Sequence, residues 1–268
     1  MKIRLLGTGA AEGIPAFCAD TYVSNYAREH GGKDLRTRCG AIIDDCLKID
    51  LPPDTLAQMH QDRVDARAWT ALFFTHSDDD HFSPAEIQYA LYPFNNRESL
   101  NFTIFANGAI CAALRTRYPQ WPMEIVEVRS FCPIEYQGYL ISPIKARHKP
   151  EEDALNFIFE KDGRSLLYAT DTGLWEEATW EYLKGFQLDL MILECTEGVV
   201  PTDYEGHLGV TDFMNVLERL RGQGTLKQDT IISTTHHSHN GGATHADLEQ
   251  LFSPKSILVG YDGLELTI

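Results

Sequence analysis

The stretch "LFFTHSDDDHFSP", residues 72–84, decides how the rest of the chain is interpreted. It places three consecutive aspartates shortly after His76 and directly before His81, at the end of a short apolar run. Such a density of charged and imidazole groups is typical either of a solvated acidic turn or of a metal site. The choice depends on whether matching ligands occur elsewhere in the chain.

Three further residues with metal-ligand chemistry follow predicted buried strands, as His76 does. His148 follows "YLISPIKAR", Asp171 follows "SLLYAT" and His236 follows "TIISTT". Strand ends in a packed α/β domain lie at one rim, so residues distant in sequence converge there on rigid supports. A pair of divalent metal ions needs roughly seven ligands with one bridging carboxylate. The candidate metal ligands are His76, Asp78, Asp80, His81, His148, Asp171 and His236.

The length and composition of the chain limit the kinds of protein it can be. The 268 residues are 43% hydrophobic, enough for a full core, and we expect a single domain over residues 1–268. The six cysteines form no C-x-x-C pair, which favours reduced thiols. No apolar run approaches the roughly 20 residues that span a bilayer, so we expect a cytoplasmic protein without a membrane partner. The net charge of -16 argues against nucleic acid as a partner and leaves room for a small anionic substrate.

Short β-rich runs alternate with helix-like segments along the whole chain. Helices are expected over about 84–91, 109–117, 174–183, 212–221 and 245–252, and predicted strands outnumber them roughly two to one. The clearest helix has apolar Phe213, Val216, Leu217 and Leu220 on one face. This pattern predicts an α/β fold of two packed sheets with helices outside. A Rossmann fold fits less well, because "GTGAAEG" lacks the full G-x-G-x-x-G.

With these ligands in place, the sequence resembles the metallo-β-lactamase fold hydrolases, whose signature H-x-H-x-D-H is matched by "HSDDDH". The segments "LLGTGAAEGIPAFC", "GGKDLRTR", "YATDTG", "EGHLG" and "TTHHSHNGGATH" resemble most the branch that contains phosphoribosyl 1,2-cyclic phosphate phosphodiesterases. That branch is related to the tRNA 3′-processing endonucleases. The resemblance covers nearly the whole chain. It implies a four-layer αββα sandwich with two divalent metal ions, usually Mn or Zn, at the sheet rim.

The resemblance also implies a division of the ligands. His76, residue 78, His148 and Asp171 would hold one metal ion. Asp171 would bridge to a second ion held also by Asp80, His81 and His236. Asp80 would in addition orient the attacking hydroxide. His207 in "EGHLG" matches the histidine that the family uses near the leaving group, so Asp80 and His207 are the expected catalytic residues.

The sequence departs from the family at two places. Asp78 replaces the second histidine of the signature, which makes the site harder and more negative and shifts its preference towards Mn, Fe or Mg. The close relatives also have a structural zinc site built from cysteines and the second histidine of "THxSH". Here Cys18 remains, with Ala19, Thr21 and Ser24 at the other positions, so His239 would lack its metal and turn to hydrogen bonding or substrate contact.

A substrate anion needs cations besides the metal ions. "KARHK" supplies Lys145, Arg147 and Lys149, which would share a face if the strand continued that far. The alternative is that these are solvated surface charges. The expected substrate-binding residues are Arg36, Arg38, Lys145, Arg147, His239 and Asn240.

We therefore expect a metal-dependent hydrolase. The first hypothesis is a phosphodiesterase that cleaves a small sugar or nucleoside phosphate, cyclic ones included, with a hydroxide activated by both metal ions. Two alternatives stay open: an ester, lactone or thioester hydrolase on the same dinuclear site, and a binding protein whose catalysis Asp78 has impaired. An RNA-processing nuclease is disfavoured by the acidity of the chain. The oligomeric state cannot be read from the sequence, although dimers are common in the family it resembles, so the resemblance leaves a homodimer open.

Overall fold

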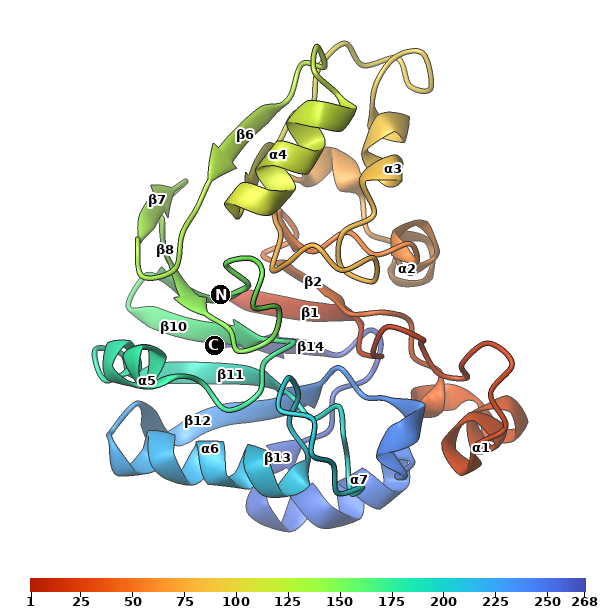
Figure 1. The fold of residues 1–268 in the computed structure, drawn as a ribbon, viewed down its shortest axis with the longest axis vertical. Coiled ribbons are helices and arrows are strands. Elements are labelled where there is room, and N and C mark those ends of the chain that lie inside the picture. The colour runs from red at the N-terminus through yellow and green to blue at the C-terminus, as the bar shows by residue number, and fades with distance from the viewer.

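Two seven-stranded sheets form the centre of the protein in the computed structural model, which describes residues 1–268 (Figure 1). The first sheet has the order β14 (Glu265–Thr267), β1 (Lys2–Gly7), β2 (Gly40–Ile43), β3 (Leu47–Ile49), β4 (Ala71–Phe73), β5 (Thr103–Ala106) and β6 (Glu124–Glu127). The second has the order β13 (Ile257–Leu258), β12 (Leu226–Thr235), β11 (Leu188–Glu194), β10 (Arg164–Ala169), β9 (Leu155–Lys161), β8 (Tyr139–Lys145) and β7 (Ile134–Tyr136).

Helices cover the outer faces of both sheets (Figure 1). Those over the first sheet are α2 (Thr55–Asp62), α3 (Pro84–Ile87) and α4 (Gly108–Arg117). Those over the second are α5 (Glu177–Leu183), α6 (Val210–Gly222) and α7 (His245–Phe252). The remaining helix, α1 (Tyr22–His30), stands at the side of the sandwich against the short turn His239–Gly241. The order of layers is helix, sheet, sheet, helix, so the predicted αββα sandwich is confirmed.

Aliphatic and aromatic side chains from both sheets fill the space between them. The Phe73 ring stacks on Phe105 of the same sheet with 4.8 Å between centroids. It also meets Phe157 and Phe159 of the second sheet edge-on, at 5.6 Å and 5.4 Å. Alternate residues of each strand point to opposite faces, so the same strands supply a second set of apolar residues to the helices outside.

The local sequence accounts for the predicted helices, although α5 begins at Glu177 instead of 174 and α3 ends at Ile87 instead of 91. The apolar stripe of Phe213, Val216, Leu217 and Leu220 is buried on one face of α6. Thr244 caps α7, with the Thr244 side chain accepting from the amide of Asp247 and the Asp247 side chain accepting in return. The five expected helices are all present, whereas α1, α2, β3, β6 and β7 were not predicted. None of the helices combines the length and apolar composition needed to cross a bilayer.

Candidate metal centre

Strand ends of the two sheets meet at one rim and carry the predicted ligands. His76 and His81 lie in the loop after β4, Asp171 follows β10 and His236 follows β12. Because β10, β11 and β12 run parallel, their carboxyl ends share one edge of the sheet. Asp171 and His236 have φ angles of 49° and 55°, a left-handed backbone that turns the chain at each strand end.

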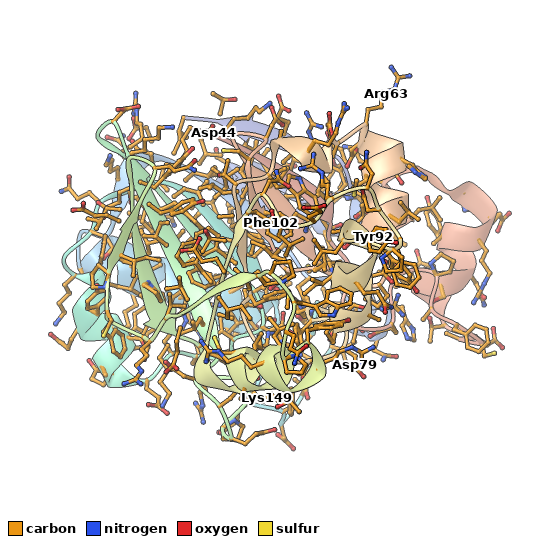
Figure 2. The ribbon with its side chains drawn as sticks, turned by 90° about the horizontal axis from the view of Figure 1, so that it is seen from above. Asp44, Arg63, Asp79, Tyr92, Phe102 and Lys149 are labelled. Atoms are coloured by element: carbon orange, nitrogen blue, oxygen red, sulfur yellow. The ribbon has the colours of Figure 1, made fainter.

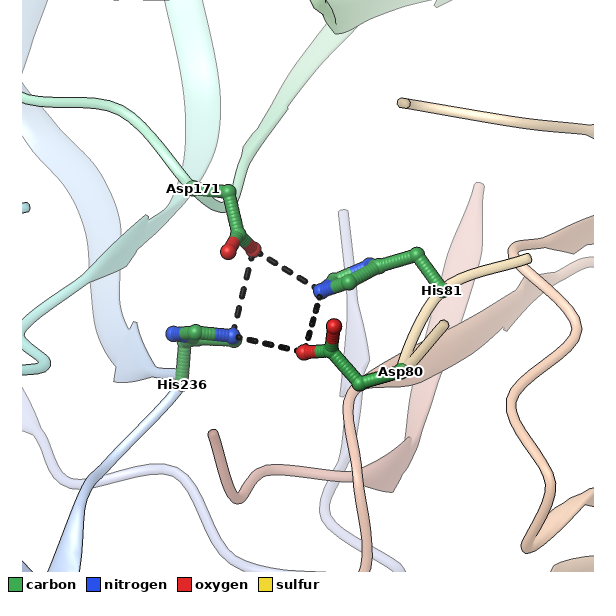
Figure 3. Close-up of side chains that lie close together, drawn as sticks. All are labelled: Asp80, His81, Asp171 and His236. Carbon is green, nitrogen blue, oxygen red and sulfur yellow. Dashed lines mark ion pairs between the residues drawn. The ribbon is translucent and has the colours of Figure 1, made fainter. Parts of the chain in front are cut away.

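One cluster of ligand atoms is formed by Asp80, His81, Asp171 and His236 (Figure 3). His81 Nε2 lies 3.2 Å from Asp80 Oδ2 and 3.0 Å from Asp171 Oδ2. His236 Nε2 lies 3.7 Å and 3.2 Å from the same two oxygens. All four side chains are buried, and their ligand atoms lie within 4.8 Å of one another. This cluster has the donors expected for the second metal ion.

A second cluster lies beside the first and shares Asp171 with it. Asp171 Oδ1 is 3.9 Å from His76 Nε2 and 3.8 Å from His148 Nε2, whereas Asp171 Oδ2 faces the first cluster. Asp78 Oδ2 joins at 3.3 Å from His76 Nε2 and 3.2 Å from His148 Nε2. The seven predicted ligands therefore gather in two clusters bridged by Asp171.

The buried imidazoles test whether these clusters suit a metal ion. The Nε2 atoms of His76, His81 and His236 are buried and have no hydrogen-bond partner. The Nδ1 atom of each ring is occupied, by Thr75 Oγ1, Asp50 Oδ2 and Thr196 Oγ1 respectively. A buried nitrogen without a partner is costly unless a ligand completes it. Three imidazoles turned inward beside three carboxylates fit a divalent cation.

The carboxylates and imidazoles of the clusters stabilise each other's charged forms. Burial raises the pKa of the Asp171 carboxyl, but His236 and His81 bring that pKa well below its usual range. Burial lowers the pKa of His81, but Asp171, Asp80 and Asp50 raise it well above the usual imidazole value. The carboxylates thus favour positive charge at their centre, which a proton on His81 supplies when no metal ion does.

Comparison with protein-family models gives a match to the β-lactamase superfamily domain over residues 47–227. The chain belongs to this superfamily. No curated protein sequence matches it. This superfamily member is similar in fold to a diphosphatase of the PhnP family, with a TM-score of 0.79, 22% identity and coverage of 100% of this chain and 97% of that one. It is also similar to zinc-bound PqqB from Methylobacterium extorquens, with a TM-score of 0.77, 16% identity and full coverage of both chains. The short form of human tRNase Z has a TM-score of 0.64, 16% identity and coverage of 100% and 99%.

Two buried carboxylates of this β-lactamase superfamily member support the ligands and were not predicted. Asp50 follows β3 and accepts hydrogen bonds from Thr75 and, at 2.7 Å, from His81 Nδ1. Glu194 ends β11 and accepts from the amides of Thr172 and Leu208. Both stand at strand ends, so the rule that selected the ligands also applies to them. Asp50 fixes the ring of His81 with Nε2 directed at Asp80 and Asp171.

His207 lies between the imidazoles of the two clusters. Its ring centroid is 4.9 Å from that of His148 and 5.3 Å from that of His236. Its Nδ1 is 2.9 Å from Glu194 Oε1. Burial lowers the pKa of His207, but the Glu194 carboxylate outweighs burial and raises it to about 9. Glu194 thus favours the protonated form of His207, and the contact at Nδ1 leaves Nε2 to face a ligand.

The cations expected around His148 have acidic partners within the chain. Lys145 and Arg147 line a cavity of about 630 Å³ that also includes His148 and Tyr204. Arg147 pairs with Glu205, and Lys145 Nζ lies 3.7 Å from Glu176. Strand β8 ends at Lys145, so Arg147 does not continue its face as the sequence suggested. Both pairs are partly exposed and therefore weak, so a bound anion could exchange with either carboxylate.

Arg36 and Arg38 are engaged elsewhere. Arg36 is 4% exposed, and its guanidinium contacts Thr8 Oγ1, the carbonyl of Gly260 and His245 Nδ1. Arg38 donates to the carbonyl of Ala11 and pairs with Asp54. This placement argues against a substrate contact for Arg36, because binding would leave several buried groups without partners.

His239 and Asn240 lie in the short turn next to α1. His239 Nδ1 is 3.0 Å from Thr21 Oγ1, and its Nε2 is 3.6 Å from Glu12. Asn240 is exposed, and its amide donates to Ser238 Oγ. A hydrogen bond between Thr21 and His239 thus joins this turn to the start of α1, as in the first of the two alternatives predicted for His239.

Proposed function

We propose that this superfamily hydrolase is a phosphodiesterase that acts on a small sugar or nucleoside phosphate, cyclic phosphates included, with two divalent ions, Mn or Zn. The observation that carries the proposal is the position of His207 between two ligand clusters that share Asp171. A bridged pair of ions suits in-line displacement at phosphorus, and a proton donor beside the pair suits departure of an alkoxide.

The residues of the chain have separate tasks in this proposal. The bound ions would supply an activated water and positive charge for the phosphate oxygens. Asp80 would accept a hydrogen bond from the attacking water and orient it. His207 would donate the proton on Nε2 to the departing oxygen, while Glu194 keeps the imidazole protonated and fixes its direction. His207 would then recover a proton from solvent.

The charges around the site favour a small substrate over a nucleic acid. The cations that line the adjacent cavity are Lys145, Arg147 and Lys149, and three carboxylates, Glu176, Asp203 and Glu205, also line it. Such a balance gives no continuous basic track for a polyanionic backbone. The same balance favours one second candidate, hydrolysis of a carboxyl ester, lactone or thioester, because an uncharged substrate needs no cation besides the metal ions.

The test begins with the metal content of protein purified without chelators. The same sample is then assayed on bis(p-nitrophenyl) phosphate and on p-nitrophenyl acetate, with and without added Mn. About two ions per chain with Mn-dependent cleavage of the diester supports the proposal. Metal-dependent cleavage of the acetate alone supports the second candidate. One ion or none, with neither substrate cleaved after Mn addition, refutes both and favours a binding protein.

A further inference from the structure

Lys149 makes its closest contact with the residue at which the chain departs from its family. Its Nζ lies 2.5 Å from Asp78 Oδ1 and 2.9 Å from Ser77 Oγ. The Lys149 side chain is 20% exposed. In Figure 2 the labels of Lys149 and Asp79 stand on the same side of the molecule, far from that of Asp44. Lys149 is therefore part of the wall of the metal centre.

A buried carboxylate fixes the position of Lys149. Glu152 Oε1 is 3.7 Å from Lys149 Nζ and accepts hydrogen bonds from the amide of Ser77 at 2.8 Å and from its hydroxyl at 3.0 Å. Glu152 Oε2 accepts from Asn107 Nδ2. The Glu152 side chain is 2% exposed, so this arrangement cannot relax into solvent at low cost. The ammonium group is therefore held against Asp78, at the edge of the cavity that Lys149 also lines.

Asp78 consequently presents its two oxygens to different partners. Oδ1 is taken by Lys149, whereas Oδ2 lies 3.3 Å from His76 Nε2 and 3.2 Å from His148 Nε2. A free carboxylate can bind a metal ion through one oxygen or both, and it carries a negative charge. The histidine of the family signature offers one donor atom and no charge.

We propose that Lys149 is a positioning residue of the metal centre that makes Asp78 a ligand with a single donor oxygen. By holding Oδ1, Lys149 leaves only Oδ2 for the ion and offsets the charge that an aspartate adds. The Asp78–Lys149 pair thus takes the place of a neutral imidazole. This inference rests on the metal-binding part of the proposed function and not on the bond that is cleaved.

The number of donor oxygens sets a preference between metal ions. Mn is bound readily by several oxygen donors at high coordination number, whereas Zn favours about four donors with nitrogen among them. If Lys149 releases Oδ1, Asp78 gains a second donor, and the cluster of His76 and His148 shifts towards Mn. Both ions carry the same charge, so a general electrostatic effect of Lys149 cancels in the ratio of their affinities.

The experiment measures the dissociation constants of Mn and Zn for the metal-free protein by competition with a chelator, without substrate. The variants are Lys149→Met, Lys149→Arg and a matched control, Lys227→Met, which removes a lysine 2.8 Å from Asp189 at the start of β12. We expect Lys149→Met to change the ratio of the Mn and Zn dissociation constants about tenfold in favour of Mn. A change of this size is typical when a residue that hydrogen-bonds to a metal ligand is replaced. Lys149→Arg and Lys227→Met should keep the wild-type ratio.

A ratio unchanged in Lys149→Met overturns the role of Lys149. So does an equal shift when Lys149→Met is added to Asp78→His, because a histidine has no second oxygen to release. Thermal melting of each variant shows whether it is folded. If Asp78→His does not fold, Lys149→Met is compared with Lys149→Arg, and an equal ratio of dissociation constants in these two variants overturns the role of Lys149. A wild-type protein that binds neither ion overturns the metal centre and with it the proposed function. Normal wild-type binding with an unchanged ratio refutes only the present inference.

Discussion

Lys48 is a fully buried lysine, and its burial makes the stability of the protein depend on pH. It lies on the outer face of β3, and its Nζ donates to the carbonyls of Ile49, at 2.8 Å, and Asp50, at 2.5 Å. Burial lowers the pKa of Lys48 to about 7, against an ordinary value of 10.5. In the unfolded chain the same amine is protonated up to about pH 10.

The sign of the effect follows from which state binds more protons. Between about pH 7 and pH 10.5 the folded protein has released the Lys48 proton and the unfolded chain has kept it, so stability rises with pH. Below about pH 7 the penalty of burying the charge is complete. At about 1.4 kcal/mol per pKa unit, the relief between pH 6 and pH 9 amounts to about 2–3 kcal/mol.

Urea unfolding of metal-free wild type and Lys48→Met at pH 6, 7, 8 and 9 measures this relief. The variant loses two hydrogen bonds to carbonyls, which adds an offset that does not change with pH. The free energy of unfolding of Lys48→Met minus that of wild type should therefore fall by about 2–3 kcal/mol from pH 6 to pH 9. A difference that stays constant over this range would show that Lys48 is not a buried titrating group.

Three further substitutions test the site and the core. His207→Gln should lower kcat about 100-fold, because the proton donor is lost, with metal content unchanged; full activity would exclude His207 as the acid. Asp171→Asn should lower the metal content by at least one ion per chain, measured by elemental analysis, because an amide does not offer an anionic oxygen to each cluster. A metal content equal to that of wild type would contradict the bridging role of Asp171. Phe73→Ala should cost about 3–5 kcal/mol in urea unfolding, because Phe73 is fully buried between the sheets; a loss below about 1 kcal/mol would mean that the core closes around the gap.

Much of the metal centre could be predicted because its chemistry follows strand ends. A short apolar run that ends in His or Asp is visible in the sequence, and parallel strands bring such ends together. This rule found Asp171 and His236, and extended to glutamate at the end of "LDLMILE" it would also have found Glu194. The layer order followed from the same pattern of short strands and amphipathic helices.

The partners of the charged side chains could not be predicted, because they join residues far apart in the chain. Asp78 and Lys149 are 71 positions apart, and Arg147 and Glu205 are 58 positions apart. Pairs between such distant residues leave no repeating pattern in the sequence. Arg36 shows the same limit, since its burial depends on the packing of β1 and the C-terminal residues around it. The missed strands β3, "LKI", and β7, "IEY", each have a charged residue in the middle, so neither strand formed an apolar run, and Asp50 after β3 was missed with it.

The ligands of the metal centre come from both sheets of the sandwich. His76, Asp80 and His81 extend from the first sheet, and Asp171 and His236 extend from the second. An ion bound between them would cross-link the two sheets, which otherwise contact each other through apolar side chains. Ion binding to the folded state alone adds stability by mass action, about 2.7 kcal/mol at a concentration 100 times the dissociation constant. Removal of the ions by a chelator should therefore weaken the contact between the sheets, and limited proteolysis with and without chelator would measure the effect.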